Sequence, residues 1–308
     1  MNSTNSASAP RKAWLAALLS VGATGLGHLY CGRLTKGLIL FFISFAFAPV
    51  IINVARISSS STFMLMVIIV SLVVMFGAFW YGVIDSALLA RRLGADYQLK
   101  EYNKWFIYLL FVVVAFGYPT NLSFSIRDHV LQAFRIPSTS MAPSILRGDH
   151  VFLNKMAYRM SAPKRGDVVI FIYPDGRHMN YLKRIIGLPG ETVEIRNNEV
   201  LINGVPLVYK KIESHQRDNM DMNGGNEVMM ETIEGQNHQV IVDKDEPENM
   251  APVTVAHGHC FLLGDNRPES RDSRSFGPVP LADVKGRVDY IYWPAVSWSR
   301  FGRFPAVH

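Results

Sequence analysis

Tyr181-Leu182-Lys183-Arg184-Ile185-Ile186-Gly187 is the stretch that indicates both the fold and the chemistry of the C-terminal half. Its aromatic and β-branched residues end at a glycine, which predicts a β-strand. Side chains alternate between strand faces, so Lys183 shares a face with Tyr181 and Ile185. If that face is buried, desolvation lowers the pKa of Lys183 from about 10.4 to about 7–8. Taken alone, the stretch also fits an exposed strand lysine.

A serine-rich segment upstream supplies a group that a neutral lysine can activate. Ser140 lies within Pro137-Ser138-Thr139-Ser140-Met141-Ala142-Pro143-Ser144. A serine hydroxyl becomes a strong nucleophile only when a base removes its proton, and lysine acts as that base only when uncharged. Proline and serine clusters are also common in turns, so this segment by itself fits an ordinary loop equally well.

A third segment raises the expectation of a site. A short apolar run ends at Gly264-Asp265-Asn266, and Ser270, Asp272 and Arg274 follow at alternating positions. Such a pattern is typical of a polar network that orients another group.

Other chemistries fit the sequence poorly. Ser161-Ala162-Pro163-Lys164 matches the S-x-x-K motif of penicillin-recognising enzymes, but a proline interrupts the required helix and the partner motifs are missing. Asn219–Gly224 imitates the start of a calcium loop, but Met230 stands where that loop needs glutamate. We therefore expect no metal site.

Five sequence blocks, in this order, resemble the bacterial type I signal peptidase (leader peptidase) family. The blocks are Pro137–Ser144, Gly148-Asp149 with Lys155, Arg165–Val169, Lys183-Arg184 with Gly187–Glu191, and Gly264–Arg274 with Gly277 and Pro280. They cover most of residues 130–290. Ordered blocks are far more specific than any single motif.

The resemblance implies a Ser/Lys peptidase that needs no cofactor. It makes Ser140 the nucleophile that forms an acyl-enzyme and Lys183 the general base. It also implies an oxyanion hole built from the Ser140 backbone N–H and the Ser138 hydroxyl.

The resemblance further implies a set of supporting residues. Ser270 is expected to hydrogen-bond Lys183 and fix its rotamer. Asp272 and Arg274 are expected to pair and hold the Ser270 loop, with Asp265 supporting from the adjacent turn. Asp265 and Arg274 equally fit a role in the fold alone.

The first 120 residues hold most of the apolar sequence, in a chain that is 49% hydrophobic. Segments Ala13–Tyr30, Gly37–Val54, Phe63–Ala90 and Trp105–Ile126 are each long enough to cross about 30 Å of hydrocarbon as a helix. Glycines and His28 interrupt the first of them. We therefore expect about four transmembrane helices within residues 1–126.

Basic residues in the short loops predict the orientation of these spans. The loops after the first and third spans are rich in lysine and arginine: Arg33, Lys36, Arg91, Arg92, Lys100 and Lys104. The loop after the second span has only Arg56. This places the first and third loops in the cytoplasm, and Ser140 follows the outer end of the fourth span.

The N-terminal region also resembles a short two-span module called a TM2 domain. The resemblance is carried by Gly25–Arg33, Lys36-Gly37 and Asp85. Many signal peptidases have only one or two spans, so this region departs from the common pattern.

Beyond residue 126 the sequence changes to short β-rich runs bounded by glycine, proline and asparagine. Asn203-Gly204 between two apolar runs predicts a two-residue hairpin. We expect an α-helical transmembrane region followed by a mainly antiparallel β catalytic domain over residues 127–308. Residues 208–255 are expected to form a polar, partly disordered insertion between core strands.

The expected function is removal of signal peptides from exported preproteins by cleavage after small residues of Ala-x-Ala type. The alternative is a specialised processing peptidase of a secretion or conjugation system. The expected location is the inner (plasma) membrane, with the catalytic domain outside. Expected partners are signal peptides, membrane phospholipids and the export translocon; the diffuse net charge of +6 indicates no nucleic acid.

Overall fold

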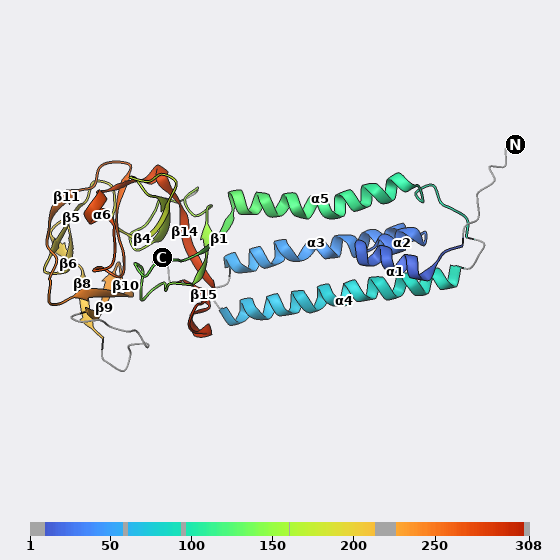
Figure 1. The fold of residues 1–308 in the computed structure, drawn as a ribbon, viewed down its shortest axis with the longest axis horizontal. Helices are drawn as coiled ribbons and strands as arrows, with labels where there is room; N and C mark the ends of the chain where they lie inside the picture. Colours follow the sequence, from blue (N-terminus) through green and yellow to red (C-terminus); the bar gives the residue numbers. More distant parts are fainter. Residues whose placement is uncertain (1–9, 58–60, 94–96, 160, 213–225, 305–308) are drawn as a thin grey trace. The chain divides into compact units, whose positions relative to one another are not determined.

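The computed structural model describes residues 10–57, 61–93, 97–159, 161–212 and 226–304 (Figure 1). The calcium-like stretch Asn219–Gly224 lies outside these residues. Contacts divide the chain into two compact units, Met1–Ser125 and Ile126–His308.

The first unit is helical. Its elements are α1 (Ala13–Gly22), α2 (Leu26–Tyr30), α3 (Leu34–Ile57), α4 (Ser61–Leu93) and α5, Trp105–His129, which ends just beyond the unit. Two helical stretches, Leu65–Leu93 and Trp105–His129, are long and apolar enough to cross a membrane. The total of about four spans stays a prediction.

The expectation of one continuous helix over Ala13–Tyr30 is wrong. The chain breaks between α1 and α2, and Gly25 there has a φ of 95°, in the left-handed region that glycine tolerates. A Cβ on Gly25 would overlap the backbone of Gly37 in α3. The break thus lets α2 approach α3 closely, which a straight helix would not permit.

The second unit is built from antiparallel β-sheets, as predicted. Its main sheet has eight strands, in the order β1-β2-β14-β3-β4-β12-β13, with β15 paired to β14. The strands are β1 (Leu131–Arg135), β2 (His150–Asn154), β3 (Val168–Ile172), β4 (Asn180–Gly187), β12 (His259–Leu263), β13 (Val279–Pro280), β14 (Val284–Trp293) and β15 (Gly302–Arg303). Short helices α6 (Ser273–Phe276), η2 (Leu281–Asp283) and η3 (Trp298–Arg300) lie between them.

Two smaller sheets lie in the chain between β4 and β12. One pairs β11 (Met250–Thr254), β5 (Thr192–Arg196), β6 (Glu199–Ile202) and β7 (Val205–Pro206). The other pairs β10 (Gln236–Asp243), β9 (Asn226–Ile233) and β8 (Val208–Lys211). The described part of 208–255 is therefore largely β-structure.

The predicted hairpin at Asn203-Gly204 is confirmed. The two residues join β6 to β7, and both have positive φ, 50° and 80°. Positive φ at both central residues is the signature of the type I′ turn, whose twist matches that of the flanking strands.

β4 is central to the main sheet and buried on both faces. On one face Leu182 packs against the cluster that contains Val168 and Ile170, and on the other Tyr181 and Ile185 pack with Phe171. Two adjacent charged residues of β4, Lys183 and Arg184, are consequently both buried, at 2% and 1% exposure.

Candidate active site

The Lys183 amine and the Ser140 hydroxyl are in direct contact. β3 and β12 flank β4, and Lys183 lies opposite Val169 of β3. The Lys183 Nζ donates to the Ser140 Oγ at 2.5 Å. Ser140 is itself only 9% exposed, in a turn after β1. The fold thus brings together a hydroxyl and an amine 43 positions apart in the sequence.

The electrostatics around Lys183 favour its neutral form. Burial lowers the pKa of Lys183 to about 8; Asp272 and Asp265 partly oppose this shift, and Arg274 adds to it. A pKa of about 8 leaves roughly one lysine in ten neutral at pH 7, against about one in a few thousand for a free lysine. The desolvation expected from the strand pattern is present.

The Ser140 turn carries the two predicted oxyanion donors. The Ser138 Oγ lies 3.2 Å from the Ser140 Oγ. The Ser140 carbonyl accepts from the Asn266 backbone N–H at 3.2 Å, which ties the turn to the segment after β12. Within the described ranges, the Ser140 N–H has no hydrogen-bond acceptor, so it is available to an incoming oxygen.

Ser270 lies beside the Ser140 turn but contacts a different partner from the one predicted. Its hydroxyl donates to the Asp272 Oδ2 at 2.6 Å. Among the described residues it makes no hydrogen bond to Lys183, whose side chain has Ser140 as its one hydrogen-bond partner. A Cβ on Gly264 would overlap the Ser270 side chain and lie 2.5 Å from the Ser140 carbonyl oxygen. Only glycine therefore permits this close approach.

Asp272 and Arg274 form the predicted pair. The Arg274 Nε and Nη2 donate to the two carboxylate oxygens of Asp272 at 2.7 and 2.8 Å. The same carboxylate accepts from the Gly264 N–H at 2.9 Å, and Arg274 also donates to the Ser270 carbonyl at 3.2 Å. The loop that carries Ser270 is thus tied to the end of β12.

Asp265 has a partner that the sequence reasoning missed. The Arg184 Nε and Nη2 donate to its carboxylate at 2.8 and 2.6 Å, and the Arg184 Nη1 donates to the Gly166 carbonyl at 2.9 Å. Burial alone would raise the pKa of Asp265, but Arg184 reverses this and holds that pKa below its ordinary value. Burial of both strand faces was the available signal, because a buried arginine needs a carboxylate.

A second buried ion pair was also missed. The Arg267 Nη2 donates to both carboxylate oxygens of Glu231 at 2.8 Å, and its Nε donates to the Gly264 carbonyl at 3.0 Å. Glu231 lies in β9 and is fully buried. The pair therefore links the inserted β-hairpin to the glycine that supports Ser140 and Ser270. The polar sequence around Glu231 gave no sign of this burial.

The described residues contain no group of three or more histidine, cysteine, aspartate or glutamate side chains that could hold a metal ion. The site itself presents the Ser140 hydroxyl, the desolvated Lys183 amine and hydrogen-bond donors.

Comparisons with known proteins point to the same chemistry. The family model described as signal peptidase, peptidase S26, matches residues 103–293. A signal peptidase I from Pseudomonas aeruginosa is 30% identical over 250 residues, covering 72% of this chain and 83% of that protein. A signal peptidase I from Aquifex aeolicus is 31% identical over 200 residues, covering 54% of this chain and 78% of that protein.

One solved structure is also similar in sequence. It is the crystal structure of a signal peptidase I from Enterococcus faecalis, with 35% identity over 41% of this chain and 97% of that chain, at a TM-score of 0.27.

Proposed function

The chain belongs to the signal peptidase I family, peptidase S26, which removes signal peptides from preproteins, and we propose that Ser140 and Lys183 are its catalytic dyad. The protein is a membrane serine peptidase with an extracytoplasmic catalytic domain. The contact of 2.5 Å between the Ser140 Oγ and the buried Lys183 Nζ carries the proposal. We assign residues 1–126 to the membrane domain and residues 127–308 to the catalytic domain.

The geometry supports a two-step reaction. Neutral Lys183 removes the proton from the Ser140 Oγ, which attacks the scissile carbonyl carbon. The Ser140 N–H and the Ser138 hydroxyl stabilise the resulting oxyanion. The Lys183 ammonium then protonates the leaving amine, and an acyl-enzyme forms. Neutral again, Lys183 activates a water molecule that hydrolyses the ester and releases Ser140.

The supporting residues act through the dyad. The carboxylate of Asp272 accepts hydrogen bonds from Ser270, Gly264 and Arg274, and so fixes the loop beside the nucleophile. The Asp265 carboxylate forms a buried ion pair with Arg184, which is the residue next to Lys183 in β4. In this proposal Ser270, Asp265, Asp272 and Arg274 are positioning residues.

The proposed cleavage follows small residues of Ala-x-Ala type in exported preproteins. Incubation of the detergent-solubilised protein with a labelled Ala-x-Ala precursor should release the signal peptide, and Ser140→Ala should release none.

Membrane phospholipids and the export translocon are the proposed partners. A specialised peptidase with narrow substrates is the second candidate, supported by the extra N-terminal helices. Rescue of a host depleted of its main signal peptidase would exclude it.

The rate of cleavage should depend on pH through Lys183. The free enzyme needs neutral Lys183, whose pKa is about 8, so kcat/KM should fall about tenfold per pH unit below this value. Initial rates between pH 6 and pH 10 on a precursor without titrating groups near the cleavage site provide the measurement. An acidic limb near pH 10.4 would show that the essential base is solvated, contrary to the proposal.

A further inference from the structure

A pocket of about 830 Å³ lies within the helical unit, at the N-terminal turn of α3. The last turns of α4 and the segment just before α5 complete its wall. The reaction described above uses none of these residues. Arg33, Lys36 and Asp85, which belong to the segment that resembles a TM2 domain, are among its lining residues.

The pocket is strongly cationic. Arg33, Lys36, Arg92 and Lys100 line it, with Asp85 as the one carboxylate among its lining residues. Asp85 is engaged by Lys36 at 2.6 Å and by His28 at 2.8 Å. In the part of the chain that the structure describes, the guanidinium groups of Arg33 and Arg92 have no carboxylate partner, and both residues are exposed. The pocket therefore offers unneutralised positive charge to a ligand.

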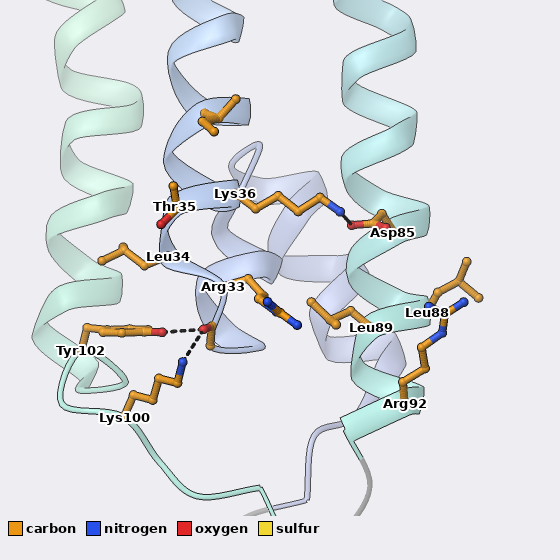
Figure 2. A pocket seen from close by; sticks show the side chains of 12 residues that line it. Arg33, Leu34, Thr35, Lys36, Asp85, Leu88, Leu89, Arg92, Lys100 and Tyr102 are labelled. Carbon is orange, nitrogen blue, oxygen red and sulfur yellow. Dashed lines mark hydrogen bonds and ion pairs between the residues drawn. The ribbon is translucent and has the colours of Figure 1, made fainter.

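The polar wall is held in place by hydrogen bonds between its elements. Figure 2 shows the Lys36 side chain reaching from α3 to Asp85 on α4. From the other side, Lys100 and Tyr102 donate to the Gly32 carbonyl at 3.1 and 2.5 Å (Figure 2). These contacts join α3 to α4 and the turn before α3 to the segment before α5, so the pocket is formed without a ligand.

An apolar groove continues from this pocket along α3. Its volume is about 480 Å³, and it shares Leu34, Thr35 and Ile39 with the cationic pocket. The remainder of the groove is lined only by apolar side chains, namely Leu38, Phe42, Ile43 and Ala46. The pocket and the groove together form one cavity, which is lined by cationic side chains at one end and by apolar side chains at the other.

The cavity opens on the cytoplasmic side of the membrane. The catalytic domain is extracytoplasmic and directly follows α5, a helix long enough to span the bilayer. The N-terminal end of α5, at Trp105, therefore faces the cytoplasm, and Lys100 and Tyr102 immediately precede it. The cytoplasmic leaflet carries the anionic lipids that attract basic segments at the membrane surface.

We propose that this cavity binds one anionic phospholipid from the cytoplasmic leaflet. The phosphate lies against Arg33, Arg92 and Lys100, at the end of α3 whose first backbone N–H groups lack intrahelical acceptors. One acyl chain follows the groove from Ile39 to Ala46. The groove selects a lipid over free phosphate, because only a lipid covers its apolar wall. The surplus of cations selects an anionic lipid over a zwitterionic one.

The test is native mass spectrometry of the full-length, detergent-solubilised protein titrated with phosphatidylglycerol, phosphatidylcholine or inorganic phosphate. The wild type should retain one phosphatidylglycerol in preference to phosphatidylcholine, and phosphate should not displace it. Arg33→Gln/Arg92→Gln should weaken phosphatidylglycerol binding by roughly 30-fold, since each interfacial cation contributes about a fivefold effect. Ile39→Trp, which fills the groove, should weaken binding without changing charge.

The matched control is Arg91→Gln/Lys104→Gln, which removes two exposed cations that do not line the pocket. It should leave the affinity within about twofold of the wild type. Circular dichroism confirms that each variant keeps its helices. Equal losses in the control and pocket variants would overturn the site in favour of diffuse surface charge. Displacement by inorganic phosphate, or unchanged binding in Ile39→Trp, would overturn the lipid as its occupant.

Discussion

Replacing Lys183 by methionine is expected to abolish cleavage while making the folded protein more stable at pH 7. Methionine keeps the length of the side chain and removes the proposed base, so kcat should fall by about 10⁴-fold or more. The lysine is 2% exposed and its pKa is lowered to about 8, so its buried charge opposes folding. A shift from 10.5 to about 8 corresponds to a cost of about 3 kcal/mol.

The pH dependence of this stability effect has a defined sign. The folded pKa lies below the unfolded one, so the unfolded chain binds more protons between about pH 8 and pH 10.5. The cost is full below pH 8 and disappears as the pH rises to 10.5. The difference in Tm between Lys183→Met and the wild type should therefore be positive at pH 7 and small at pH 10.5. Ser140→Ala, which keeps the lysine, is the control and should show no such trend.

Two results would contradict this account of Lys183. One is measurable cleavage of the Ala-x-Ala precursor by Lys183→Met, which would move the role of base to another residue, with Lys155 the first to test. The other is a Tm difference that does not change with pH, which would mean that the amine is hydrated in the folded protein.

Replacing Arg184 by methionine should lower the free energy of unfolding more than any of the other proposed substitutions. It leaves the Asp265 carboxylate, which is 1% exposed, without its bidentate partner. Removing one member of a buried ion pair typically costs about 3–5 kcal/mol. The measurement is thermal unfolding of the solubilised protein, followed by near-ultraviolet circular dichroism.

A surface pair of the same geometry provides the matched control. Arg196 donates to both carboxylate oxygens of Glu194 at 2.6 and 2.8 Å, but its side chain is 63% exposed. Arg196→Met should cost less than about 1 kcal/mol. The double variant Arg184→Met/Asp265→Leu should recover much of the loss, because neither charge then remains buried alone. An Arg184→Met protein as stable as Arg196→Met would contradict the desolvation argument.

The sequence predicted most of the dyad's surroundings for a local reason. The alternation of side chains along one strand predicted that Lys183 shares a face with Tyr181 and Ile185. The structure shows in addition that the opposite face of this strand is buried. The pairing of Asp272 with Arg274, which the family resemblance implied, is also a contact between residues only two positions apart. Such features follow from neighbours in the chain, which sequence patterns describe well.

The features that were missed depend on long-range packing. Arg184 meets Asp265 across 81 positions, and Arg267 meets Glu231 across 36. A local sequence pattern does not reveal contacts between residues so far apart in the chain. The break between α1 and α2 is similar, because its reason is the approach of Gly25 to Gly37 in another helix. The resemblance implied a hydrogen bond between the Ser270 hydroxyl and Lys183, whereas this hydroxyl donates to Asp272, two residues further along the chain.

The bond between Arg267 and Glu231 limits how this enzyme can be shortened. Cutting away the β9–β10 hairpin would leave the permanently charged Arg267 guanidinium without its Glu231 counterion. That guanidinium is hydrogen-bonded to the carbonyl of Gly264, the glycine that lies against the Ser140 turn. A trimmed enzyme that keeps Arg267 should therefore misfold near its reactive centre. Trimming together with an apolar residue at position 267 offers the workable route to a smaller enzyme.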